Sequence, residues 1–176
     1  MNPDSSRDMS DALETARTLV DDGRFATDLA RRVAFRTESP QASSRPALLD
    51  YLHDEIGPTR ASLGFTCRFL EAGSSAPFLL AARDEDPDRP TVLIYGHGDC
   101  VSGMDAQWRA GLSPWSLAQE GDRLYGRGTA DHQGQHSVNI AAVAPAIATR
   151  RRHGFNYRLP LGSGKESGAG GLRGAR

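Results

Sequence analysis

The sequence predicts a three-layer α/β fold, and two observations lead to this fold class. Helical patterns come first, over residues 10–22, 25–36 and 47–63, and short strand patterns follow from residue 65 onward. A further helical pattern, over residues 133–151, stands between the later strands. Helices that precede a sheet and connect its strands are typical of α/β domains, in which helical layers cover the sheet.

The helices are predicted from their ends and from the spacing of their apolar residues. Ser10 is expected to cap the first helix and Gly23 to end it. The second helix has an apolar stripe formed by Phe25, Leu29, Val33 and Phe35. Pro58 is expected to disturb the third helix, and Pro145 to kink the last one, because proline cannot donate a backbone hydrogen bond.

The strands are predicted from short runs of β-branched and aromatic residues. These runs cover residues 65–70, 77–82, 91–95 and 155–161. Residues 115–125, with glycine at position 121, predict a hairpin. The run at 91–95 is apolar and uncharged, which predicts a strand buried on both faces, as in a parallel sheet.

Composition excludes several classes of function. A chain of 176 residues with 38% hydrophobic content suits one globular domain. A net charge of −1 gives no electrostatic reason to expect nucleic acid or an anionic membrane as partner. No apolar stretch approaches the roughly 18 residues of a membrane span. Two cysteines are too few for a disulfide framework and the first residues lack a signal-peptide pattern, so we expect a cytoplasmic protein.

Gly96-His97-Gly98-Asp99 is the first candidate site, directly after the run at 91–95. Ligands of α/β sheets bind at the carboxyl ends of strands. In an extended chain residues 97 and 99 point to the same side, so the Asp99 carboxylate can orient the His97 ring while the other ring nitrogen faces a metal. Against this, a single histidine is more often an ordinary polar residue than a metal ligand.

Asp131 is the second candidate, in the glycine-rich segment before the helix at 133–151. The residues allow two interpretations, a functional carboxylate near a helix N-terminus or simply the N-cap of that helix. His132 and His136 lie four residues apart and are a further candidate pair of metal ligands. Glu166 follows the predicted strand at 155–161, as His97 follows the predicted strand at 91–95. Both side chains are therefore expected in one crevice at the carboxyl ends of the strands.

In this order, the segments resemble the superfamily of two-zinc aminoacylases and exopeptidases, which includes acetylornithine deacetylase, succinyl-diaminopimelate desuccinylase, glutamate carboxypeptidase and carnosinase. The matching phrases are Gly96-His97-Gly98-Asp99, Trp108 with Ser113-Pro114-Trp115, Leu124-Tyr125-Gly126-Arg127-Gly128-Thr129-Ala130-Asp131, and Glu166-Ser167-Gly168. The resemblance covers residues 10 to 172 and implies a zinc-exopeptidase-like αβα catalytic domain.

The resemblance also implies a function and a set of site residues. The expected substrates are N-acyl amino acids or small peptides, whose amide bond is hydrolysed with two zinc ions; cobalt or manganese would suit the same donors. His97 is expected to bind one zinc, with Asp99 orienting its ring. Asp131 is expected to bridge both ions and Glu166 to bind the other. The family pattern further implies a cis peptide bond between Asp131 and His132.

Two residues depart from the family pattern. Lys165 stands at the position of the general base, where the family has glutamate, and an ammonium group cannot accept a proton. Gln133 stands where the family usually has lysine. We therefore expect impaired hydrolysis, with a non-catalytic remnant that binds at most one weak metal as the alternative. A third hypothesis, a Cys100 nucleophile beside His97, has little support because residue 100 points away from residue 97 on an extended chain.

The resemblance places further ligands and a lid and dimerisation domain beyond Arg176. We therefore expect an incomplete catalytic domain that does not form the family-type dimer. Its expected parts are a helical region at 1–63, the sheet and its helix at 64–161, and a tail at 162–176 whose six glycines favour disorder. A sheet that ends there would leave 155–161 as an uncovered edge strand.

Overall fold

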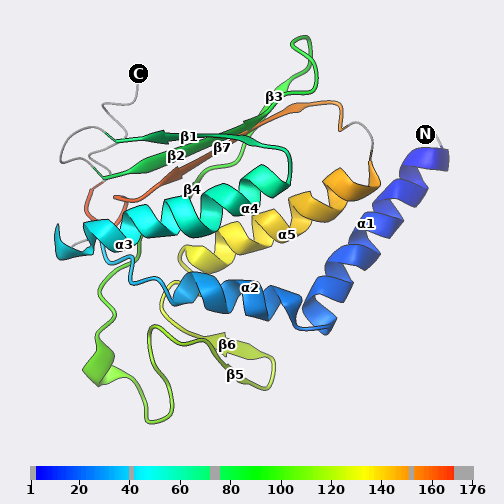
Figure 1. The fold of residues 1–176 in the computed structure, drawn as a ribbon. Coiled ribbons are helices and arrows are strands. Elements are labelled where there is room, and N and C mark those ends of the chain that lie inside the picture. Colours follow the sequence, from blue (N-terminus) through cyan, green and yellow to red (C-terminus); the bar gives the residue numbers. More distant parts are fainter. Residues whose placement is uncertain (1–2, 40–41, 72–75, 151–152, 169–176) are drawn as a thin grey trace.

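Helices cover one face of a mixed sheet in the computed structural model of the chain (Figure 1). The structure describes residues 3–39, 42–71, 76–150 and 153–168. The α/β class predicted from the sequence is confirmed, and the described residues supply the sheet and the helical layers on that face.

The helices follow the predicted positions closely. They are α1 (Pro3–Asp21), α2 (Arg24–Val33), η1 (Ala42–Ser44), α3 (Arg45–Asp50), η2 (Tyr51–Ile56), α4 (Gly57–Ser62), η3 (Asp105–Gln107) and α5 (Gln133–Thr149). The prediction that Ser10 caps the first helix is wrong, because α1 begins at Pro3. Proline suits a first helical turn, where its missing N–H is not needed.

The disturbance predicted at Pro58 takes the form of a π-helical segment. The segment η2 lies between α3 and α4, and the Gly57 N–H bonds back to the Leu52 carbonyl, five residues earlier. Pro58 follows directly and has no N–H with which to continue an α-helical ladder. The helical path therefore continues through the proline by widening one turn instead of ending there.

Seven strands form a main sheet and a separate hairpin. They are β1 (Thr66–Leu70), β2 (Phe78–Arg83), β3 (Thr91–Leu93), β4 (Gly96–His97), β5 (Ala118–Glu120), β6 (Arg123–Tyr125) and β7 (Asn156–Gly162) among the described residues. The main sheet has the order β1-β2-β7-β3. β4 also pairs with β7, at residues of β7 that follow those paired with β3. β7 is antiparallel to β2 and parallel to β3 and β4. The predicted hairpin is β5–β6, with Glu120 opposite Arg123.

Two sequence predictions about the sheet are wrong. The strand at 155–161 is central, because β7 pairs with β2 on one side and with β3 and β4 on the other. The run at 91–95 is not buried on both faces: Leu93 is 67% exposed and Val92 is 37% exposed. In the described chain β3 pairs with β7 alone, so it is an edge strand, and burial begins only at Gly96.

The core lies between the sheet and the helices η2 and α5. One cluster of buried residues consists of Tyr51, Leu52, Ile56, Leu79, Ile140 and Leu161. A second consists of Phe65, Ala81, Val143, Tyr157 and Leu159. Both join β2 and β7 to the helices, so burial of apolar surface fixes β7 at the centre of the sheet. α1 and α2 pack against the outer side of α5 (Figure 1).

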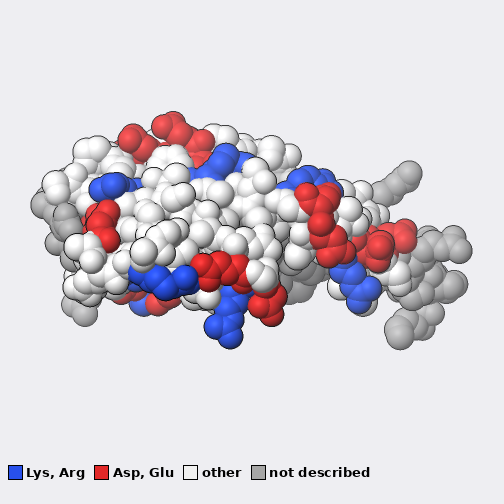
Figure 2. All heavy atoms as spheres, turned by 90° about the horizontal axis from the view of Figure 1, so that it is seen from below, with Lys and Arg blue, Asp and Glu red and all other residues white. Residues whose placement is uncertain are grey.

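Charged side chains of both signs are mixed on the face that carries the β5–β6 hairpin. Figure 2 shows Asp and Glu interspersed with Arg across this face. Every helix in the described part of the chain is too short or too polar to cross a bilayer.

Candidate metal centre

The predicted site residues gather at the carboxyl ends of two neighbouring parallel strands. His97 ends β4 and pairs with Gly162, the last residue of β7. The Gly98 N–H donates to the Gly162 carbonyl across 2.7 Å, which continues the pairing past β4. Glu166 lies in the turn that follows β7, so the strand pairing brings two segments almost seventy residues apart to one edge.

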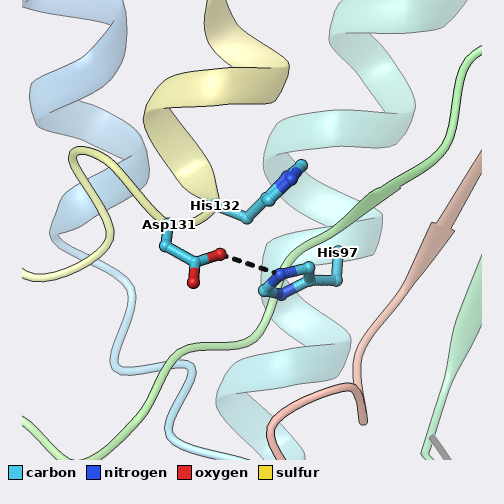
Figure 3. A group of neighbouring side chains, drawn as sticks. All are labelled: His97, Asp131 and His132. Atoms are coloured by element: carbon cyan, nitrogen blue, oxygen red, sulfur yellow. Dashed lines mark hydrogen bonds and ion pairs between the residues drawn. The ribbon is translucent and has the colours of Figure 1, made fainter.

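His97, Asp131 and Glu166 approach one another closely at this edge. The Nε2 atom of His97 lies 3.1 Å from Oδ1 of Asp131 and 3.9 Å from Oε1 of Glu166. The His97 side chain is 1% exposed and that of Glu166 is 16% exposed, whereas that of Asp131 is 62% exposed. Figure 3 shows the Asp131 carboxylate directed at the His97 ring. The structure thus brings together the three groups that the sequence proposed as ligands.

Asp99 lies beneath His97 and connects it to the turn that carries Glu166. The Nδ1 atom of His97 lies 3.0 Å from the Asp99 carbonyl and 3.2 Å from its Oδ1. The hydrogen-bond geometry is satisfied at the carbonyl, and the carboxylate contact is electrostatic. Oδ2 of the same carboxylate accepts the Glu166 N–H at 2.9 Å. Acceptors face both ring nitrogens, the Asp99 oxygens at Nδ1 and Asp131 Oδ1 at Nε2, so a metal bound at Nε2 would leave the ring hydrogen on Nδ1.

His97 and Asp99 each favour the charged form of the other. Burial opposes ionisation of His97, but the hydrogen bonds and the charge of Asp99 outweigh it and raise the pKa of His97 above its usual 6.5. Burial likewise opposes ionisation of Asp99, but its contact with His97 and the hydrogen bond from the Glu166 N–H outweigh burial and lower its pKa from the usual 3.8. Asp99 is therefore a buried carboxylate that holds the imidazole in place.

Asp131 precedes α5 without capping it. The N-cap residue is His132, and no side chain makes a capping hydrogen bond there, so the N-cap interpretation of Asp131 is wrong. The peptide bond between Asp131 and His132 is cis, as the family resemblance predicted.

His132 and His136 face different surroundings. The His132 ring lies 4.4 Å from the His97 ring, measured between centroids, and one ring nitrogen of His132 lies within 4.8 Å of ligand atoms of both His97 and Asp131. His136 turns into the core, where its Nε2 pairs with the Tyr51 hydroxyl. The predicted pair is therefore split: His132 joins the site, and His136 is a core residue.

The buried His136 should make the stability of the fold depend on pH. Burial, and then the charges of Arg32 and Arg60, hold its pKa well below 6.5, so the folded protein keeps it neutral where the unfolded chain binds a proton. Relative to His136→Gln, we expect the wild type to lose up to about 1.4 kcal/mol of unfolding free energy per pH unit below pH 6.5.

Urea denaturation between about pH 7.5 and pH 5.5 measures this slope. The glutamine amide of this variant keeps a polar partner for Tyr51 and does not titrate. His53→Gln, at an exposed position, is the matched control and should follow the wild type. Parallel curves for the wild type and His136→Gln would contradict the prediction.

Lys165 lies between the two acidic groups of the site. Its Nζ is 2.6 Å from Oε1 of Glu166 and 3.7 Å from Oδ2 of Asp131. The hydrogen bond to Glu166, together with the charges of both carboxylates, raises the pKa of Lys165 above 10.5. The side chain is accordingly an ammonium at neutral pH and holds its proton.

The remaining residues singled out in the sequence have structural positions. Gln133 is 0% exposed and donates to the Arg32 carbonyl at 3.1 Å and to Thr37 Oγ1 at 3.2 Å. Cys100 is also 0% exposed and contacts Thr37, and burial raises its pKa to about 11. A thiol with that pKa is not a nucleophile at neutral pH, so the structure gives the Cys100 hypothesis no support.

The donor set fits a divalent cation. Imidazole nitrogens and carboxylate oxygens are the ligands that zinc, cobalt and manganese accept. His132 Nδ1 is buried and has no hydrogen-bond partner among the described residues. His132 was missed as a companion of His97 because the two are 35 positions apart and only the fold brings them together.

Comparison with known proteins agrees with this picture. Residues 93–175 match the family described as peptidase family M20/M25/M40. The sequence is 34% identical over 94 residues to the Beta-Ala-His dipeptidase of Mus musculus, covering 53% of this chain and 19% of the relative. It is 30% identical over 111 residues to the succinyl-diaminopimelate desuccinylase of Methylibium petroleiphilum, covering 60% of this chain and 28% of the relative. The crystal structure of human carnosine dipeptidase 1 matches with a TM-score of 0.82 and 25% identity, covering 92% of this chain and 37% of that chain.

The sheet, its helical layer and the residues at the strand ends define the catalytic-domain fold of the metal-dependent exopeptidases. The chain resembles the M20 zinc-exopeptidase superfamily in sequence over residues 93–175 and in fold, and these matches confirm the resemblance inferred from the sequence. It spans less than a third of the length of these two curated relatives.

Proposed function

We propose that the chain provides the divalent-metal site of a hydrolase domain for amide bonds in small peptides or N-acyl amino acids. The observation that carries this proposal is the approach of Asp131 and Glu166 to His97 Nε2, at 3.1 and 3.9 Å. Exposed acidic residues are common, but an oriented, buried imidazole at a strand end beside two carboxylates is the arrangement that metal hydrolases use.

The substrate class is supported by the kinds of relatives that the chain matches. One is named as a dipeptidase and another as a desuccinylase, and both names describe cleavage of an amide bond in a small substrate. We propose zinc as the metal, with cobalt or manganese as alternatives that the same donors accept.

Each residue has a proposed role. His97, Asp131 and Glu166 hold the metal, and Asp99 orients His97 through Nδ1. A divalent ion in such a site polarises the amide carbonyl and lowers the pKa of water. Lys165 stands where the reaction needs a proton acceptor, and its Nζ is already protonated and bonded to Glu166. We therefore propose that hydrolysis is impaired in this chain.

Metal binding can be measured directly. Zinc titration by calorimetry should show saturable binding to the wild type, and Asp131→Ala should weaken it at least tenfold, because a lost ligand costs no less than a lost supporting residue. Asp122→Ala, in the exposed turn of the β5–β6 hairpin, is the matched control and should bind as the wild type does. Equal affinity of Asp131→Ala and the wild type would refute the site.

Activity separates impaired hydrolysis from the second candidate, a non-catalytic metal-binding domain, which the ammonium at position 165 favours. General acid–base catalysis contributes on the order of 10²–10⁴ in rate. We expect the zinc-loaded wild type to hydrolyse N-acetyl amino acids at least 10²-fold more slowly than a family enzyme that has glutamate at the position of Lys165. Rates equal to those of such an enzyme, and abolished by Asp131→Ala, would show that hydrolysis is not impaired.

A further inference from the structure

The ammonium of Lys165 takes a position inside the proposed metal site. Its Nζ is 2.6 Å from Glu166 Oε1, and the same oxygen lies 3.9 Å from His97 Nε2. The other carboxylate, Asp131, directs Oδ1 at His97 and Oδ2 at Lys165, with the latter 3.7 Å from Nζ. Asp131 thus bridges an imidazole on one side and a cation on the other.

His132 adds a donor on the imidazole side of Asp131. Ligand atoms of His97, Asp131 and His132 all lie within 4.8 Å of one another. Zinc bonds of about 2.0–2.2 Å require ligand atoms closer together than this, by roughly 1 Å. The Asp131 side chain is 62% exposed, so it is free to make this adjustment.

We propose that the site binds a single divalent ion, held by His97, Asp131 and His132, and that the Lys165 ammonium stands in for a second ion beside Glu166. This inference rests on the proposed function, because it presupposes a metal at this edge of the sheet. It replaces Glu166 by His132 as the third ligand of this ion, because the Glu166 carboxylate is bonded to Lys165, and it gives Lys165 a role other than that of a lost base.

Charge balance supports one ion rather than two. Asp99, Asp131 and Glu166 supply three negative charges, and Lys165 supplies one positive charge through its contacts with Glu166 and Asp131. One divalent ion added on the imidazole side brings the sum of these charges to zero. A second ion would lie beside an ammonium that has no further carboxylate near it among these residues, and like charges at such distances repel strongly in a partly buried site.

Metal stoichiometry tests the role of Lys165. Calorimetry with zinc alone, together with the zinc content after dialysis, should give one ion per wild-type chain and two per chain for Lys165→Glu, which replaces the cation by a third carboxylate. Lys165→Arg keeps the positive charge and is the matched control, with one ion expected. Two ions in the wild type or in Lys165→Arg, or a single ion in Lys165→Glu, would overturn the proposal.

Affinity tests the role of His132. We expect His132→Asn to weaken zinc binding at least about tenfold and to change the visible absorption of the cobalt-loaded protein, since one nitrogen donor is lost. His53→Asn, at an exposed position where the ring stacks on Phe69, should change neither. Far-ultraviolet circular dichroism verifies that each variant is folded. Unchanged affinity and absorption in folded His132→Asn would overturn this assignment.

The outcomes separate this inference from the proposed function. A wild-type chain that binds no zinc would remove the metal site itself, and with it both proposals. A wild-type chain that binds two ions, and loses them in Asp131→Ala, would support the proposed function and overturn only the single-ion inference.

Discussion

Replacing Glu55 by alanine is expected to lower the free energy of unfolding by about 3–5 kcal/mol. Oε1 of Glu55, on η2, lies 3.0 Å from Nε of Arg32, on α2. Arg32 is only 1% exposed. The Nη1 atom of Arg32 donates to Ser137 on α5 at 2.7 Å. Without the carboxylate, a buried guanidinium charge would lack its counter-ion, and its desolvation would be uncompensated.

A matched control shows whether the loss of stability comes from the burial of the charge or from the loss of any ion pair. Glu120 pairs with Arg109 at 2.7 Å, but the two side chains are 46% and 57% exposed. Glu120→Ala should therefore cost far less than Glu55→Ala, because water screens exposed pairs. Urea denaturation at pH 7 measures both variants. Equal losses in the two would show that burial of Arg32 does not set the size of the effect.

The second large effect is expected for Gly134→Ala, in the first turn of α5. A Cβ added to Gly134 would overlap the Thr129 carbonyl oxygen, a backbone atom that cannot turn aside. Helix propensity alone would favour alanine by at most about 1 kcal/mol. The overlap outweighs it, since overpacking costs about 1–3 kcal/mol, and more where the backbone must move. We expect a net loss of roughly 1–3 kcal/mol in the free energy of unfolding, measured by urea denaturation.

This substitution should also weaken metal binding, because the displaced segment leads from Thr129 to Asp131. The Gly134 N–H donates to the Gly128 carbonyl at 2.9 Å, so the loop is held against α5 at this residue. Gln135→Ala, at the next and exposed position of the same helix, is the control and should leave stability and zinc affinity nearly unchanged. A Gly134→Ala variant more stable than the wild type would show that the loop adapts without cost.

Local sequence patterns were good predictors of elements and of candidate ligands, but poor predictors of neighbours. The strand at 155–161 was correctly located, yet it lies at the centre of the sheet, because apolar residues such as Leu159 and Leu161 are buried there against the helices. His132 was paired with His136 from their spacing, yet only His132 reaches His97. The spacing of residues along a helix does not show which of them will face a residue on a distant strand.

The sequence by itself determined the α/β class, the family resemblance, the three candidate ligands and the presence of lysine at position 165, because each depends on residue types and their order. Only the tertiary structure decided that β7 separates β2 from β3, that Asp131 lies between His97 and Lys165, and that His132 joins them. Those contacts arise when strand pairing and core burial bring distant segments together, and no local pattern records the distance between two side chains.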